Sequence, residues 1–170
     1  NDIYPMWVAA HGVMIVTPVH WYQATSPLKL MMDRLVCADG GNPDPTTTKG
    51  KNPLLAKQLE LKGWSYPKHL AGRAFSVIVH GDAAGPETLR RILTDWLTDM
   101  EMVPAGATAL IDTWVGWYQP YATSHDDLDK DKALFAEVSN AALALVNMVK
   151  LMRTGKYHAP DETLRDPREK

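Results

Sequence analysis

The sequence has little of what marks a secreted, membrane-spanning or nucleic-acid-binding protein. Its one cysteine, Cys37, leaves no partner for a disulfide within the chain, so a reducing, cytoplasmic location is expected. The net charge is −2 and no basic run occurs, which gives no reason to expect a nucleic-acid partner. No uninterrupted apolar run reaches the ~18 residues that a membrane-spanning helix needs, so membrane insertion is not expected.

The motifs of several common chemistries are also missing. The sequence holds no G-x-S-x-G, no Walker pattern and no G-x-G-x-x-G, so a hydrolase triad or a phosphate-binding loop of those types has little support. The six histidines lack HxxxH or HExxH spacing, and a metal site is not expected. What remains is the composition of an ordinary globular domain, 45% hydrophobic and 22% charged over 170 residues.

Three short apolar runs predict strands that are buried on both faces. They cover residues 13–17, 74–80 and 107–111. None alternates regularly with polar residues, and near-continuous apolar strands are typical of a parallel sheet covered by helices on both sides.

A helical pattern follows each apolar run. The first stripe contains Leu28, Met31, Met32, Leu35 and Val36, the second Leu89, Ile92, Leu93, Trp96, Leu97 and Met100, and the third Leu128, Phe135, Val138, Ala142, Leu145 and Val149. Gly85 and Pro86 open the second helix, and the third is predicted over residues 127–152. This alternation of strands and helices predicts a layered α/β fold.

Local signals predict where these helices begin and end. Ser26 can cap the first helix, with Pro27 at its first position. Ser124 and Asp127 resemble a capping box before the third, and Gly155 marks its end. An i,i+4 ion pair is expected between the lysine and the aspartate of the first helix, Lys29 and Asp33.

The connecting segments suggest one domain with a tail. We expect residues 1–155 to form the domain and residues 156–170, charged and proline-containing, to form an extended C-terminal tail. Residues 38–53 are rich in Gly, Pro, Thr and Asn and predict a long loop.

Two segments leave strands at the edge where parallel sheets bind ligands, outside the strand carboxyl ends. The first supplies Thr17, Pro18, Val19, His20, Trp21 and Tyr22 as candidate binding residues, and the second supplies His80, Gly81, Asp82 and Gly85. An aromatic, proline-stiffened loop beside a glycine loop suits a flat aromatic ligand, because a ring covers one face and backbone N–H groups approach the polar edge.

The first of these segments also carries a family resemblance. The stretch TPVHWYQATSPLKLMMDR resembles the flavin-binding loop and following helix of NAD(P)H-dependent FMN reductases, whose pattern is roughly T-P-x-Y/H-W/Y followed by P-L-K-x-x-x-D-R. The matching residues are Thr17, Pro18, His20, Trp21, Pro27, Leu28, Lys29, Asp33 and Arg34. The order of strands and helices extends the resemblance over residues 13–152.

The resemblance implies a flavodoxin-like doubly wound parallel sheet of strand order 2-1-3-4-5. The three apolar runs would then be its third, fourth and fifth strands, and the first two strands would be absent from this sequence. The family usually holds the FMN phosphate with a Ser/Thr/Arg-rich loop after its first strand, and nothing before Val13 has that composition. We therefore expect the sequence, which opens with Asn1, to be part of a longer chain.

The function that the resemblance implies is an oxidoreductase with FMN as cofactor and NAD(P)H as co-substrate. Electrons would pass to a quinone, a flavin or a similar small-molecule acceptor, in a homodimer or homotetramer, and no side chain is needed as an acid or base. Two alternatives stay open. One is a flavodoxin-type electron carrier without NAD(P)H activity, which the small net charge of −2 disfavours, and the other is a cofactor-free interaction protein on the same fold.

Several of these candidate site residues also have structural interpretations. Trp21 and Tyr22 are either ligand-facing or core aromatics, and their position just after a strand favours the ligand site. For His80, a structural role and a flavin-loop role weigh equally. The aromatic residues at 114, 117 and 118 fit a nicotinamide-side lining and a subunit contact equally well.

Overall fold

The apolar runs form a parallel sheet at the centre of the fold, as expected. The computed structural model of the chain describes residues 3–38, 52–63, 68–81, 84–114 and 120–159. The strands of the sheet are β1 (Gly12–Pro18), β2 (Ala74–Gly81), β3 (Val103–Pro104) and β4 (Leu110–Trp114). β2 lies in the centre and pairs in parallel with β1 on one side and with β3 and β4 on the other.

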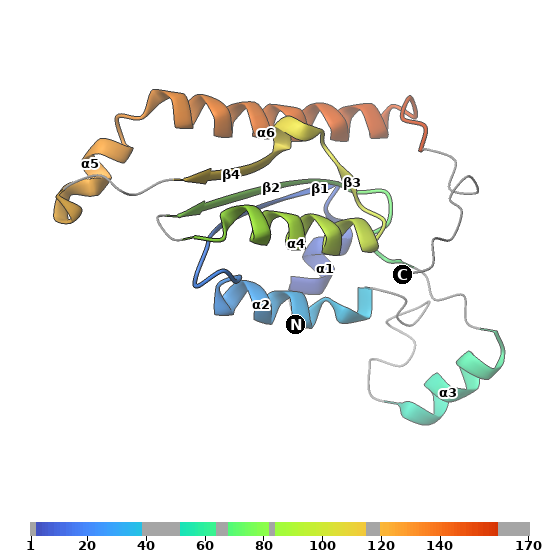
Figure 1. The fold of residues 1–170 in the computed structure, drawn as a ribbon. Coiled ribbons are helices and arrows are strands. Elements are labelled where there is room, and N and C mark those ends of the chain that lie inside the picture. The colour runs from blue at the N-terminus through green and yellow to red at the C-terminus, as the bar shows by residue number, and fades with distance from the viewer. Residues whose placement is uncertain (1–2, 39–51, 64–67, 82–83, 115–119, 160–170) are drawn as a thin grey trace, which may run out of the picture.

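Helices cover both faces of this sheet (Figure 1). One face carries α1 (Ile3–Ala9), α2 (Ser26–Arg34) and α4 (Pro86–Asp99), and the opposite face carries α6 (Lys132–Arg153). The order of the longer strands, β1-β2-β4, is that of three consecutive strands on one side of a doubly wound sheet.

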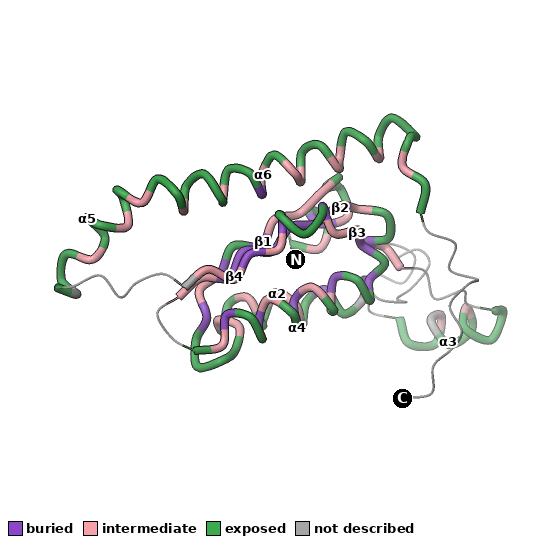
Figure 2. The backbone as a smooth tube through the Cα atoms, turned by 45° about the horizontal axis from the view of Figure 1, so that its top comes forward, coloured by how far each residue is buried: buried purple, intermediate pink, exposed green. Residues whose placement is uncertain are grey.

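The apolar core is divided by the sheet into two parts. Phe75, Val77 and Val79 of β2 are fully buried against the leucines of α4 on the side of α1 and α2. The other face of β2 presents Ile78, which packs with Ile111 and Ala141 under α6. The α6 side is much the smaller of the two parts, and the helix itself is largely exposed (Figure 2).

Helix α6 is long and apolar enough to cross a membrane, judged by length and composition alone. In the described part of the chain it is the one helix with these properties. It carries Glu137, Lys150 and Arg153 and lies along the sheet. This is weak evidence for a membrane, because amphipathic helices with an apolar face pass the same test.

Helix α1 precedes the first predicted strand and was not foreseen. Its Trp7 is buried against Trp96 of α4, with ring centroids 6.0 Å apart. The guanidinium of Arg73 donates hydrogen bonds to the carbonyls of Val8 and Ala10, which lie at the C-terminal end of α1. Arg73 thereby satisfies carbonyls that a helix end leaves without partners.

The third predicted strand was placed too early in the chain. Residues Ala107–Ala109 form a 3₁₀ turn, and β4 begins only at Leu110. Gly106, with φ 110°, introduces the turn, and the hydroxyl of Ser76 donates to the carbonyl of Ala109 at 2.8 Å. The strand is thus interrupted, with the short β3 upstream pairing separately with the first residues of β2.

The predicted helix boundaries were only partly right. Helix α2 begins at Ser26, but its N-cap is Thr25, which makes no side-chain cap hydrogen bond, so the predicted Ser26 cap is wrong. The ion pair between Lys29 and Asp33 is confirmed, and Gly85 and Pro86 open α4 as expected.

The predicted third helix is two helices. These are α5 (Ser124–Leu128) and α6, and Asp131 begins the second by accepting a hydrogen bond from the backbone N–H of Leu134. The capping box at Ser124 is wrong, because the N-cap of α5 is Thr123, and its side chain makes no hydrogen bond to the start of the helix. Gly155 follows the C-cap of α6 with φ 68°, as its predicted role requires.

The long loop predicted over residues 38–53 ends where an unforeseen helix, α3 (Pro53–Leu61), begins. Asn52 caps this helix by accepting a hydrogen bond from the N–H of Leu55. Most of the predicted loop, and residues 160–170 of the predicted tail, lie outside the described residues.

Candidate functional site

The segments that follow β1 and β2 lie side by side at the carboxyl edge of the sheet. The backbone N–H of Val19 donates to the carbonyl of His80 at 2.8 Å, which continues the strand pairing past Pro18. The side chain of Val19 is 4% exposed and belongs to the core. The two loops proposed from the sequence are therefore brought together, and Val19 joins them through its backbone.

A tight turn places two aromatic residues at the tip of the first loop. His20 and Gln23 exchange two backbone hydrogen bonds, of 3.0 and 2.9 Å. Between them Trp21 has φ 48° and Tyr22 has φ 65°. Two central residues with positive φ are the mark of a type I′ turn, which normally takes Asn-Gly. Large aromatic residues are strained there, and such strain concentrates at ligand sites.

The same turn presents its aromatic side chains and backbone to solvent. Trp21 is 90% exposed and Tyr22 55% exposed, so the interpretation of Trp21 as a core residue is wrong. The N–H groups of Val19 and His20 are already used in backbone hydrogen bonds. Within the described part of the chain, the N–H groups of Trp21 and Tyr22 have no hydrogen-bond partner and remain available to a ligand.

The glycines of the second loop allow it to pack against the first. A Cβ on Gly85 would lie 2.7 Å from Tyr22 Cα, and one on Gly81 would lie 2.7 Å from Val19 Cγ1. Gly85 also has φ 111°, which side-chain-bearing residues rarely adopt. The sequence assigned these glycines to close approach to a ligand, whereas their immediate contacts are with the aromatic loop.

The other predicted site residues have different surroundings. Thr17 is buried, and its hydroxyl donates to the carbonyl of Pro18 at 3.0 Å, so it shapes the loop. His80 is partly buried, and this burial lowers the pKa of its imidazole. His20 is exposed, and Asp82 lies outside the described residues. No group of three potential metal ligands occurs among the described side chains.

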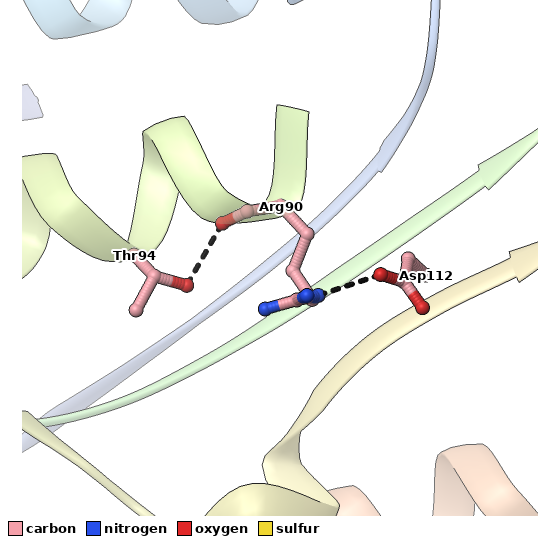
Figure 3. A network of polar contacts seen from close by, with 3 residues as sticks. All are labelled: Arg90, Thr94 and Asp112. Carbon is pink, nitrogen blue, oxygen red and sulfur yellow. Dashed lines mark hydrogen bonds and ion pairs between the residues drawn. The ribbon is translucent and has the colours of Figure 1, made fainter. Parts of the chain in front are cut away.

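An ion pair just behind the glycine loop was missed from the sequence. Arg90 Nε of α4 lies 2.8 Å from Asp112 Oδ2 of β4, and the two side chains are 24% and 33% exposed (Figure 3). Asp112 had a signal, because aspartate is depleted in strands and here interrupts an apolar run.

A separate open groove lies at the opposite, amino end of β1. It has a volume of about 680 Å³, and it is lined by His11, Gly12, Leu145, Val146, Val149, Lys150, Arg153 and Thr154. None of the predicted site residues lines this groove. Because β1 spans seven residues at about 3.3 Å each, the groove lies roughly 20 Å from the aromatic turn.

A parallel sheet with helices on both faces and ligand-facing loops at its carboxyl edge defines a flavodoxin-like α/β protein. The family model for NADPH-dependent FMN reductase matches residues 1–116, and the chain belongs to that family. The family uses FMN, with NAD(P)H as the electron donor. No curated protein and no solved structure matches the chain.

Proposed function

We propose that the chain takes hydride from NAD(P)H and passes electrons to a quinone, a free flavin or a similar small acceptor, through FMN held at the carboxyl edge of the sheet. The observation that supports this proposal is the strained aromatic turn of Trp21 and Tyr22, packed on Gly85 and exposed to solvent. Strain and exposure of large apolar rings both cost free energy in the absence of a ligand.

The described residues fit the ring end of FMN. The indole of Trp21 offers a flat apolar face, and the free N–H groups of Trp21 and Tyr22 offer donors to a polar ring edge. Bound FMN would supply the redox chemistry, by accepting hydride and releasing electrons. His80, held toward its neutral form by burial, would add no charge to the site near neutral pH.

The remaining parts of the proposal concern the whole protein. We assign residues 1–155 to the FMN-binding domain and 156–170 to a tail, and we place the protein in the cytoplasm as a homodimer or homotetramer. The exposed apolar side chains of α6, including Phe135, Leu143 and Val146, are the kind of surface that a subunit contact covers.

Anaerobic titration tests the proposed activity. The purified protein is loaded with FMN, and NADPH or NADH is added while the visible absorbance of the flavin is followed. We expect NADPH or NADH to bleach the absorbance of the bound flavin. Adding a quinone or free flavin should then restore that absorbance. FMN binding without bleaching would identify an electron carrier, and absence of FMN binding would identify a cofactor-free protein. Either result would contradict the proposal.

A further inference from the structure

Asp112 is the one Asp, Glu, Lys or Arg among the described strand residues. A charged group in a strand is disfavoured, and its partial burial adds a desolvation cost unless a partner compensates. The partner is Arg90 of α4, whose Nε lies 2.8 Å from Asp112 Oδ2. The side chains of Arg90 and Asp112 are 24% and 33% exposed, whereas those of the Lys29–Asp33 ion pair are 61% and 56% exposed. The pair of Arg90 and Asp112 is therefore better shielded from water.

The ion pair joins α4 to β4 close to the aromatic turn. Asp112 stands opposite Val79 in the sheet, two residues before β2 ends at Gly81. Arg90 lies in the first turns of α4, one residue after Leu89, whose N–H donates to the carbonyl of Gly85 at 3.0 Å. The ion pair therefore fixes the start of α4 relative to the strand ends.

The start of α4 packs directly against the aromatic turn. Gly85 lies so close to Tyr22 that a Cβ would meet both the Cα and the ring of that tyrosine. A shift of α4 along the sheet would move Gly85 and change the space available to the strained turn. No other ion pair between α4 and the sheet is present in the described part of the chain.

We propose that Asp112 and Arg90 are positioning residues, which set the geometry of the FMN-facing turn through the start of α4. This inference rests on the proposed flavin site. Among the described residues, no hydrogen bond or ion pair joins Arg90 or Asp112 to the turn. The ion pair acts through Gly85. Its loss should therefore lower the affinity of the turn for the FMN ring without removing a hydrogen bond or ion pair to FMN.

The test measures the same variants with and without FMN. Asp112→Asn, Arg90→Gln and the double variant are titrated with FMN by fluorescence, and exchange of the Leu89 amide is measured by NMR in the FMN-free protein. Each single variant should bind FMN about tenfold more weakly, or about 1.4 kcal/mol, and should exchange Leu89 faster. The double variant should be no worse than either single one, because the pair acts as a unit.

Thr94→Ala is the matched control. It removes the neighbouring hydrogen bond from Thr94 Oγ1 to the carbonyl of Arg90 and leaves the ion pair in place (Figure 3). It should bind FMN as the parent does. If Asp112→Asn does not fold, Arg90→Gln, which removes the ion pair from the other side, gives the same comparison.

Two results would overturn the inference while leaving the proposed function intact. One is unchanged FMN affinity in a folded Asp112→Asn protein with a lower melting temperature, which would mark a purely stabilising pair. The other is an equal loss of affinity in Thr94→Ala. If the parent protein does not bind FMN, the proposed function fails separately, and unchanged Leu89 exchange would then also reject the positioning role.

Discussion

At the scale of single residues, Trp21 combines two properties that rarely occur together. Its φ of 48° is unfavourable for a large side chain, and its indole is 90% exposed. Neither property stabilises the folded chain. A ligand that stacks on the indole offsets both, which is why this residue has the clearest expected phenotype.

Trp21→Ala should lower FMN affinity by about five- to a hundredfold, which corresponds to the roughly 1–3 kcal/mol measured for bases stacked on aromatic side chains. The melting temperature of the FMN-free protein should barely change, because an exposed side chain leaves no cavity. Flavin fluorescence titration and thermal melting measure the two effects. Trp21→Phe, which keeps a ring, should retain most of the affinity, and a loss as large as that of alanine would argue against stacking.

His80 should make the stability of the protein depend on pH. Burial lowers the pKa of its imidazole in the folded state below the ordinary value of about 6.5. At a pH between the two values, His80 binds more protons in the unfolded chain than in the folded one. The contribution of His80 to stability is therefore fully present above about pH 6.5 and is lost as the pH falls toward the pKa of His80 in the folded state. Melting temperatures of the parent and His80→Gln at about pH 7.5 and pH 5 measure this effect. His80→Gln should lose less stability on acidification, and identical losses would show that His80 is not responsible.

At the scale of secondary structure, the aromatic turn joins β1 to α2 through a geometry that suits other residues. Type I′ turns favour Asn-Gly because both tolerate positive φ, whereas Trp21 and Tyr22 do not. A turn selected for stability alone would carry those residues. The observed pair is a local conflict of the kind that concentrates at functional sites.

Replacing Trp21-Tyr22 by Asn-Gly should therefore separate stability from binding. Relief of strain should raise the free energy of unfolding by about 1–3 kcal/mol at each of the two positions, while FMN affinity should fall at least as far as in Trp21→Ala. Denaturant unfolding and flavin titration make the comparison. Unchanged or lower stability would mean that the turn is not strained, and unchanged affinity would remove it from the site.

The sequence predicted the elements whose signals are local and strong. β1, β2 and α4 follow from apolar runs and from the Gly85-Pro86 start. The sequence predicted a strand that includes residues 107–109, whereas in the structure they form a 3₁₀ turn that follows Gly106 and accepts a hydrogen bond from the hydroxyl of Ser76. Such tertiary contacts are not visible in a single sequence.

The candidate site was predictable in the same partial way. The aromatic and glycine loops were located by their position after strands, and the structure places them together. The turn type could not be predicted, because it depends on the backbone angles of Trp21 and Tyr22. The ion pair of Arg90 with Asp112 could not be predicted either, because it joins residues 22 positions apart in the sequence.

At the scale of the whole molecule, the sheet is unevenly covered. β1 pairs with β2 on one side, and no described strand pairs with its other edge. Val16 of β1 is 57% exposed, and Leu143 and Val146 of α6 are 59% and 46% exposed. An unpaired edge beside an apolar helix face favours association with another polypeptide.

The chain should therefore self-associate as its concentration rises. Val16→Lys combined with Val146→Lys should reduce this association, because charge on an edge and its neighbouring face disfavours pairing. Light scattering over a concentration series measures it. Leu61→Lys on α3, which is 78% exposed in the parent, is the control and should change association little. A monomeric parent with a sharp cooperative melt would show that the edge is harmless.

FMN should bind at the carboxyl edge of the sheet, where the turn of Trp21 and Tyr22 packs on the glycine loop, and not in the groove at the amino end of β1. Hydrogen exchange with and without FMN measures this directly for both places. On adding FMN, we expect slower exchange at residues 18–23 and 84–89 and no change at residues 8–12 and 145–154 around the groove. Protection of the groove residues without protection of the turn would contradict it.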